Sequence, residues 1–151
     1  MIQEVMGWEN YHLHLFRFGE KEYGVPDPEY PSEMRNERGR RLREFLHDEG
    51  MVFGYEYDFG NRWQHELVFE RIITGSGVTD AMCLEGERSC PPEDVGGPTG
   101  YMEYLEALRD SSHPDHREMV EWRGHSFNPE LFDLERINRR LSHLPWSRRR
   151  T

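Results

Sequence analysis

The first half of the chain holds histidine and aspartate side chains of the kind that bind metal ions or transfer protons. His12 and His14 are two residues apart, so on a strand both side chains lie on the same face. His65 follows a turn that begins near Asp58, and a neighbouring strand could bring these groups together. Imidazole and carboxylate groups are typical ligands of Zn²⁺ and other transition metals. His-x-His alone is a weak signal, however, and hydrogen-bonded packing residues are the commoner explanation.

A second candidate is the loop Cys90–Gly97, which combines stiff, acidic and permissive residues. Two prolines fix φ angles and remove N–H donors, while two glycines permit positive φ. Between them lie two carboxylates, an arrangement that suits holding a cation or presenting backbone N–H groups to an anion. The alternative, which we favour, is a structural loop that covers the sheet and whose acids cap the helix that includes Tyr101 or pair with arginines. The residues concerned are Cys90, Glu93, Asp94, Gly96 and Gly97.

Aromatic and basic side chains offer further chemistry. Tyr57 and Trp63 could stack on a base or line a pocket, although aromatic residues of a half-buried sheet are commoner. Arginines gather in 38–43 and 136–150 and could contact phosphate, but a solvated helix face is the usual explanation. The net charge of -10 opposes non-specific DNA binding. The Walker A, G-x-G-x-x-G, G-x-S-x-G and H-E-x-x-H motifs are absent.

These observations define one candidate site and one hypothetical metal centre. The site contains His12, His14, Tyr57, Asp58, Trp63, His65, Cys90, Glu93, Asp94, Gly96, Gly97 and Tyr101. The hypothetical ligands of a divalent metal such as zinc are His12, His14, His65, Glu93 and Asp94.

The hydrophobic pattern predicts the elements that must position these residues. Alternating aromatic residues predict an antiparallel hairpin over 51–73, with its turn at 59–62, and a strand over 11–18. A short helix is expected over 38–47, a short strand over 81–84, and helices after residues 100, 113 and 128. Strands before helices indicate an α+β fold, with an antiparallel sheet centred on the 51–73 hairpin and C-terminal helices packed on it. We expect one domain over 1–144 and a basic tail over 145–151.

Four segments together resemble the plasmid pRiA4b ORF-3-like family. They are Gly7-Trp8 with His12-Leu13-His14, the run from Tyr55 to His65, the run from Cys83 to Tyr101, and the run from Phe127 to Asp133. The similarity extends over nearly the whole chain and implies an α+β domain found in bacteria, archaea and mobile elements. Some members are labelled TnpR-like or element-associated, but a serine resolvase needs an N-terminal serine nucleophile among arginines. The first serine here is Ser32, in a proline- and glutamate-rich loop.

Two departures from the family pattern have consequences. Asn61 stands where the family usually has Asp, so a charge is lost if that position is a ligand or a base. Members usually begin with an additional strand and the first part of a helix, whereas Met1 here falls inside that helix. We therefore expect self-association or a partner chain that covers the missing strand, or reduced stability.

Three functions remain open on the sequence. The leading hypothesis is a small cytoplasmic binding or interaction module, associated by family with plasmids and mobile elements, because neither a signal peptide nor a membrane span is recognisable. The first alternative is a metal-dependent hydrolase, in which the metal activates water at the His/Asp/Glu site. The second alternative is a nucleic-acid-binding accessory protein that uses the arginine clusters.

Overall fold

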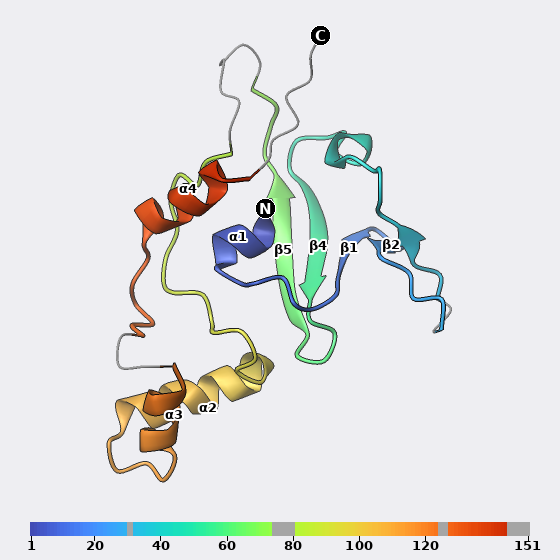
Figure 1. Ribbon diagram of the computed structural model, residues 1–151. Helices are drawn as coiled ribbons and strands as arrows, with labels where there is room; N and C mark the ends of the chain where they lie inside the picture. The colour runs from blue at the N-terminus through green and yellow to red at the C-terminus, as the bar shows by residue number, and fades with distance from the viewer. Residues whose placement is uncertain (30–31, 74–80, 124–126, 145–151) are drawn as a thin grey trace. The chain divides into compact units, whose positions relative to one another are not determined.

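The computed structural model describes residues 1–29, 32–73, 81–123 and 127–144. The chain divides into two compact units, which are coloured by residue number in Figure 1. The sheet unit is Tyr11–Ser76, and the helical unit combines Met1–Asn10 with Gly77–Thr151.

The described residues of the sheet unit form five strands in the order β3-β2-β1-β4-β5. All neighbouring strands are antiparallel except β2 and β3, which are parallel. The α+β class and the hairpin are confirmed, but β1 is the middle strand and the hairpin lies to one side. The strands are β1 (His14–Phe18), β2 (Lys21–Gly24), β3 (Arg35–Asn36), β4 (Met51–Tyr57) and β5 (Trp63–Phe69).

The strand register puts candidate residues in two adjacent rows on one face of the sheet. His14 pairs with Tyr57 across β1 and β4, and Tyr57 pairs with Trp63 across β4 and β5. Tyr55 likewise pairs with His65. Directly opposed residues share a face, so this end of the sheet is both aromatic and polar.

Phenylalanine rings form the core at the other end of the same face. Phe18, Tyr23 and Phe53 are buried there. The Phe18 ring stacks on Phe45 at 4.5 Å and on Phe53 at 5.0 Å between centroids. Aromatic stacking therefore supplies much of the packing in this unit.

The segment 38–47 forms a single 3₁₀ turn, η1 (Leu42–Glu44), rather than the predicted helix. Gly39 has φ 81°, a left-handed conformation that interrupts helical backbone. Several arginines of like charge also crowd this short stretch, and few helical hydrogen bonds could offset the cost of nucleation. Phe45 and Leu46 reach the core without a helix.

Four helices lie among the described residues of the helical unit, and glycine or capping residues mark several of their ends. Gly7 ends the first helix with φ 87°, and Asp133 caps the last by accepting a hydrogen bond from Arg136 N at 2.9 Å. The helices are α1 (Ile2–Met6), α2 (Gly97–Arg109), α3 (His116–Arg123) and α4 (Leu134–Ser142).

Two predicted elements are wrong, because their backbone groups form hydrogen bonds with distant side chains. Residues 81–84 do not form a strand, since the backbone N–H and carbonyl of Cys83 pair with the side-chain amide of Asn138 at 2.8 and 3.0 Å. No helix starts at Asn128, whose carbonyl accepts a hydrogen bond from the Ser89 hydroxyl at 2.7 Å. The predicted tail over 145–151 lies outside the described residues.

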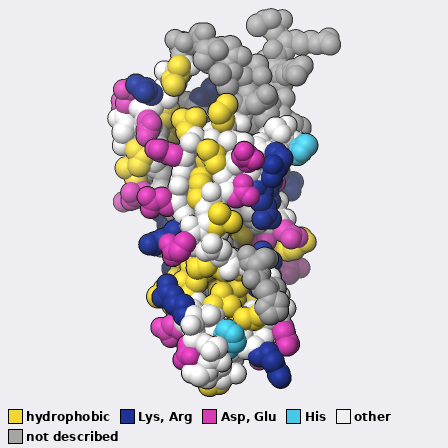
Figure 2. Space-filling view, turned by 90° about the vertical axis from the view of Figure 1, so that its left-hand side faces the viewer, with side chains coloured by type: hydrophobic (Ala, Val, Ile, Leu, Met, Phe, Trp, Pro, Cys, Tyr) yellow, Lys and Arg dark blue, Asp and Glu magenta, His cyan; other side chains and the backbone are white. Residues whose placement is uncertain are grey.

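The surface mixes charged and apolar groups. Figure 2 shows acidic and basic side chains with hydrophobic side chains between them. In the part of the chain that the structure describes, no helix combines the length and apolar composition needed to cross a membrane.

Candidate functional site

The turn of the β4–β5 hairpin is organised by the carboxylate of Asp58. Its Oδ1 accepts hydrogen bonds from the backbone N–H groups of Gly60 and Asn61 at 3.1 and 3.3 Å. Its Oδ2 accepts a bond from Asn61 Nδ2 at 2.6 Å. Asp58 is buried and has φ 58°, a left-handed conformation that aspartate tolerates better than most residues. The carboxylate is therefore held rigidly in a known orientation.

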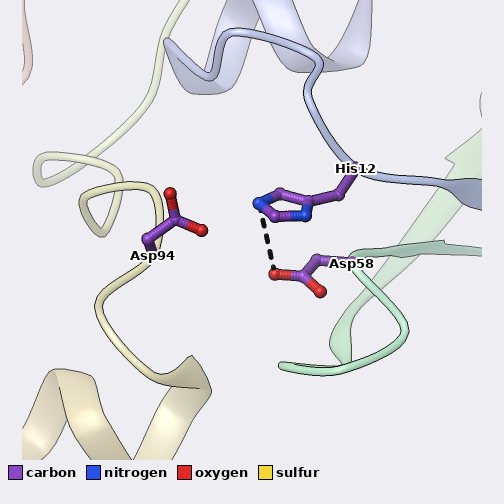
Figure 3. A group of neighbouring side chains, drawn as sticks. All are labelled: His12, Asp58 and Asp94. Carbon is purple, nitrogen blue, oxygen red and sulfur yellow. Dashed lines mark ion pairs between the residues drawn. The ribbon is translucent and has the colours of Figure 1, made fainter.

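His12 lies beside this carboxylate. Its Nε2 is 3.7 Å from Asp58 Oδ2, and Figure 3 shows the ring turned toward the carboxylate. The backbone N–H of His12 donates to the Tyr57 hydroxyl at 3.3 Å. The structure thus brings together three predicted site residues within the sheet unit. Asp94, which is also drawn in Figure 3, belongs to the helical unit.

His14 has a partner that the sequence did not suggest. Its Nε2 lies 3.1 Å from Glu37 Oε1, and both side chains are about three-quarters buried. Glu37 is placed by the pairing of β2 with β3, since its backbone N–H donates to Gly24 O at 2.9 Å. Nothing in the loop sequence around residue 37 marks it, because the link depends on a two-residue parallel strand.

Tyr55 lies next to His14, with 5.6 Å between the two ring centroids. The tyrosine is 2 % exposed, and its hydroxyl has no hydrogen-bond partner among the residues that the structure describes. Burial, with smaller contributions from Tyr57 and Glu37, raises the pKa of the Tyr55 hydroxyl strongly. The hydroxyl is therefore a neutral donor at physiological pH.

His65 forms a hydrogen bond with the backbone of the neighbouring strand. Its Nδ1 lies 3.3 Å from the carbonyl of Tyr55, so Nδ1 carries the hydrogen and donates. Burial lowers the pKa of His65, and hydrogen bonds to the Tyr55 and Trp63 backbone oppose this shift. The three predicted histidines thus have three different partners: Asp58, Glu37 and a main-chain carbonyl.

In the helical unit, the Cys90–Gly97 loop is tied to the chain that follows α1. The indole Nε1 of Trp8 donates to the Pro91 carbonyl at 3.0 Å, and Trp8 is 2 % exposed. The backbone N–H of Glu9 donates to Glu93 Oε2 at 2.6 Å. Glu93 therefore fixes the loop in place through its carboxylate.

The end of the loop starts α2. Gly96 occupies the N-cap position with φ 91°, and Gly97 has φ 71°. The positive φ angles explain both glycines, since other residues adopt them at a cost. Because Gly96 is the N-cap residue, neither Glu93 nor Asp94 occupies the capping position that the sequence assigned to these acids. Tyr101 lies within α2.

Cys90 is a protonated thiol rather than a thiolate. Burial raises the pKa of Cys90 to about 12, with a further contribution from Glu93, while Arg140 acts in the opposite direction. Burial and the neighbouring Cys90 also raise the pKa of Tyr101. Cys83 and Cys90 are both free. A group with this pKa is a poor nucleophile and a poor metal ligand near neutral pH.

A groove with a volume of about 430 Å³ lies between α1, the Cys90–Gly97 loop and α4. Arg140 braces it, donating to Glu4 Oε2 and to the Trp8 carbonyl, both at 3.1 Å. Arg123 and Arg136 also line the groove, and within the described residues neither guanidinium has an ion pair or hydrogen bond. The sequence identified the loop but not these arginines, because residues scattered over three segments leave no local pattern.

Most of the chain matches one known protein family. The family described as "Plasmid pRiA4b ORF-3-like protein" matches residues 1–136. The chain belongs to the plasmid pRiA4b ORF-3-like family. The matched region includes the whole sheet unit and all groove residues except Ile137 and Arg140.

Two relatives place this pRiA4b ORF-3-like chain among proteins without a described activity. It is 38% identical over 153 residues to the uncharacterized protein y4hQ of Sinorhizobium fredii (strain NBRC 101917 / NGR234), covering 99% of this chain and 79% of y4hQ. It also resembles the crystal structure of MM3350, a protein of unknown function from Methanosarcina mazei Go1. That match has a TM-score of 0.76 and 35% identity, and covers 89% of this chain and 77% of the other. The similarity supports the α+β fold. Because neither relative has a described activity, the function has to be inferred from the site.

Proposed function

We propose that this protein is a binding module, and that its ligand is an anion with an apolar body that lies in the groove between α1, the Cys90–Gly97 loop and α4. The observation that carries the proposal is the pair of arginines in this groove, Arg123 and Arg136, which have no acidic partner among the described residues. Both residues are exposed, and a guanidinium without a protein anion can pair with a carboxylate or phosphate of a ligand.

The acids of the same groove are already engaged. Glu4 accepts a hydrogen bond from Arg140, and Glu93 accepts one from the backbone of Glu9. Asp133 accepts one from the first turn of α4. Their charges are partly neutralised or directed at backbone donors, so they oppose an incoming anion less than their number suggests.

The groove walls favour a ligand that also has an apolar part. Val5, Phe132 and Ile137 line the groove beside the arginines. A volume of about 430 Å³ lies within the usual range of small-molecule sites, roughly 300–1,000 Å³. The Trp8–Pro91 and Arg140–Trp8 hydrogen bonds hold the walls in place, which reduces the entropy lost on binding.

Binding accounts for this groove better than catalysis does. Its thiol, Cys90, is protonated near neutral pH because burial raises its pKa to about 12. A nucleophilic cysteine needs a lowered pKa and a neighbouring base. We therefore propose that the groove binds a ligand and that Cys90 does not act on it as a nucleophile.

The test uses three probes, hexanoate, hexanol and inorganic phosphate, with binding measured by isothermal titration calorimetry. We expect hexanoate to bind and hexanol to bind more weakly, because only the acid offers a negative charge. Arg136→Gln should weaken hexanoate binding by about tenfold, or about 1.4 kcal/mol. The matched control is Arg139→Gln on the same helix, since Arg139 is exposed and pairs with Glu135 outside the groove. Equal losses in the two variants, or no binding of either anion, would contradict the proposal.

A metal-dependent hydrolase is a second candidate, favoured by the His12–Asp58 pair. An imidazole nitrogen and a carboxylate oxygen 3.7 Å apart can both contact one cation. The test is the melting temperature with Zn²⁺ or Mn²⁺, which should rise in the wild type and not in His12→Gln. The same rise in both proteins would rule out this pair as the metal site.

A further inference from the structure

A second groove in the helical unit lies between α2 and α3. Acidic and basic residues are equal in number along the first groove, whereas this second groove is acidic. Its volume is about 730 Å³, and no lysine or arginine of the described residues lines it. Carboxylates line it from both helices and from the segments at their ends. They are Asp94, Glu103, Glu106, Asp115, Glu118 and Glu121. We call this the α2–α3 groove.

Three of these carboxylates have no counter-ion in the part of the chain that the structure describes. Asp115 lies 4.0 Å from His113, and Glu121 lies 3.8 Å from Arg117. In contrast, the side chains of Glu103, Glu106 and Glu118 have no ion pair or hydrogen bond among the described residues. They come from both helices, so negative charge lines both walls.

The aromatic part of the α2–α3 groove contains a buried hydroxyl without a partner. Tyr104 lines the groove and is 1 % exposed, and its hydroxyl has no hydrogen-bond partner among the described residues. Buried polar groups are nearly always hydrogen-bonded, so an orphan of this kind is the mark of a missing partner. Trp122 packs edge-on against Tyr104 with 5.7 Å between ring centroids, and it is 47% exposed. The groove thus offers aromatic surface next to its carboxylates.

We propose that the α2–α3 groove binds a basic segment of another protein chain, one in which arginine or lysine side chains flank an apolar residue. Cationic groups would pair with Glu103, Glu106 and Glu118, and the stem of one cationic side chain would lie on the exposed Trp122 ring. Arginine and lysine are attracted to such ring faces as well as to carboxylates. A polar group of the segment would complete the hydrogen bonding of Tyr104.

The spread of the carboxylates favours an extended ligand over a single metal ion. No three carboxylates of this groove come close enough to share a metal ion in the described part of the chain. Charges distributed along two helices are matched by charges distributed along a peptide. The groove is also larger than one cation or one side chain needs.

The experiment measures fluorescence anisotropy of a fluorescein-labelled tetrapeptide of arginine, leucine, arginine and arginine. We expect binding that weakens between about 50 mM and about 300 mM salt, as screening of partly exposed charges requires. The double variant Glu103→Gln/Glu118→Gln should weaken binding by about tenfold. The control Glu87→Gln/Glu135→Gln removes the same net charge outside the groove and should change affinity by less than about twofold.

Tyr104→Phe separates binding from folding. Without peptide, its melting temperature should equal or exceed that of the wild type, because an unpartnered buried hydroxyl is removed. Its affinity for the peptide should fall, because the polar contact is lost. Unchanged affinity in both Tyr104→Phe and Glu103→Gln/Glu118→Gln would overturn the proposal, as would equal losses in groove and control variants.

Spermidine is the competing probe. If it displaces the peptide at the concentration at which unlabelled peptide does, the groove selects charge alone and the proposal of a protein segment fails. Arg136→Gln should leave peptide binding unchanged, so a failure here is distinguishable from a failure of the anion groove.

Discussion

Asp58 uses both carboxylate oxygens to shape the hairpin turn and still faces His12. Asn61 is the neighbour that makes this possible, because its amide nitrogen donates to Asp58 Oδ2 at 2.6 Å. A carboxylate at position 61 would instead place two negative charges at hydrogen-bond distance. The uncharged amide of Asn61 thus avoids a charge repulsion that, between two acids, only a bound cation could offset.

The variant Asn61→Asp tests this interpretation. Without added metal it should lower the free energy of unfolding by about 1–3 kcal/mol, because a buried hydrogen bond is replaced by like-charge repulsion. A divalent cation such as Ca²⁺ or Zn²⁺ should restore much of the loss by bridging the two carboxylates. Urea denaturation with and without the cation measures both effects.

Asn61→Ala serves as the control for Asn61→Asp. It should also be destabilised, but it should gain nothing from metal. A stable Asn61→Asp protein in the absence of metal would show that Asp58 does not depend on its amide partner.

Individual residues differ in how far the sequence could identify them. The proximity of His12 and Asp58 follows from strand pairing that the hydrophobic pattern already indicated, so the sequence could suggest it. Glu37 and Arg136 could not be found, since Glu37 reaches His14 through a two-residue strand and Arg136 faces a groove assembled from three segments.

Elements with strong local signals were predictable, and elements set by long-range side-chain contacts were not. The β4–β5 hairpin alternates over seven residues per strand, and Asp133 caps α4 by an ordinary local contact. Residues 81–84 are all apolar, as in a short strand, but Asn138, 55 positions away, forms the hydrogen bonds of the Cys83 backbone. Periodicity describes which faces are apolar and contains no information about such distant partners.

The N-cap of α4 gives a prediction at the scale of the element. Asp133→Ala removes the acceptor for the N–H of Arg136 and should lower the free energy of unfolding by about 1 kcal/mol. Asp133→Asn keeps an acceptor and should cost only a fraction of this. Thermal and urea denaturation followed by circular dichroism compare the two variants. Equal stability of Asp133→Ala and the wild type would mean that the cap contributes nothing.

His65 on β5 gives a prediction about pH. Burial lowers its pKa in the folded state below the value of about 6.5 in the unfolded state, so the unfolded chain binds the proton first. Its contribution to stability is therefore complete above about pH 6.5 and falls as the pH drops toward the folded-state pKa.

His65→Gln isolates this contribution from that of the other histidines. The difference in free energy of unfolding between the wild type and His65→Gln should shift in favour of the variant as the pH falls from about 8 to about 5. Urea denaturation across this range gives the difference at each pH. Parallel profiles for the two proteins would mean that His65 titrates alike in both states.

At the scale of the whole molecule, the net charge favours some classes of binding partner and disfavours others. The chain has 29 acidic and 19 basic residues, a net charge of -10 and a pI near 5.3. A negative field repels the phosphate backbone, and the four arginines that line the first groove lie beside four acidic residues. The two grooves differ in charge, because acidic and basic residues balance along the first and no lysine or arginine of the described residues lines the second. This difference is the basis for proposing an anion in the first groove and a basic segment in the second.

This charge distribution predicts that the protein does not bind duplex DNA of arbitrary sequence at about 150 mM salt, where surface charges act over only about 8 Å. A gel-shift titration should leave the duplex free at protein concentrations at which the labelled basic peptide is bound. A complex whose affinity falls steeply with log salt would instead show phosphate contacts by several arginines. In that case the cluster at 38–43 is the first region to neutralise, because it lies in the sheet unit and can be changed without altering either groove. If binding is retained after that change, the arginines of the helical unit would have to contact the DNA. DNA should then compete with hexanoate for Arg136.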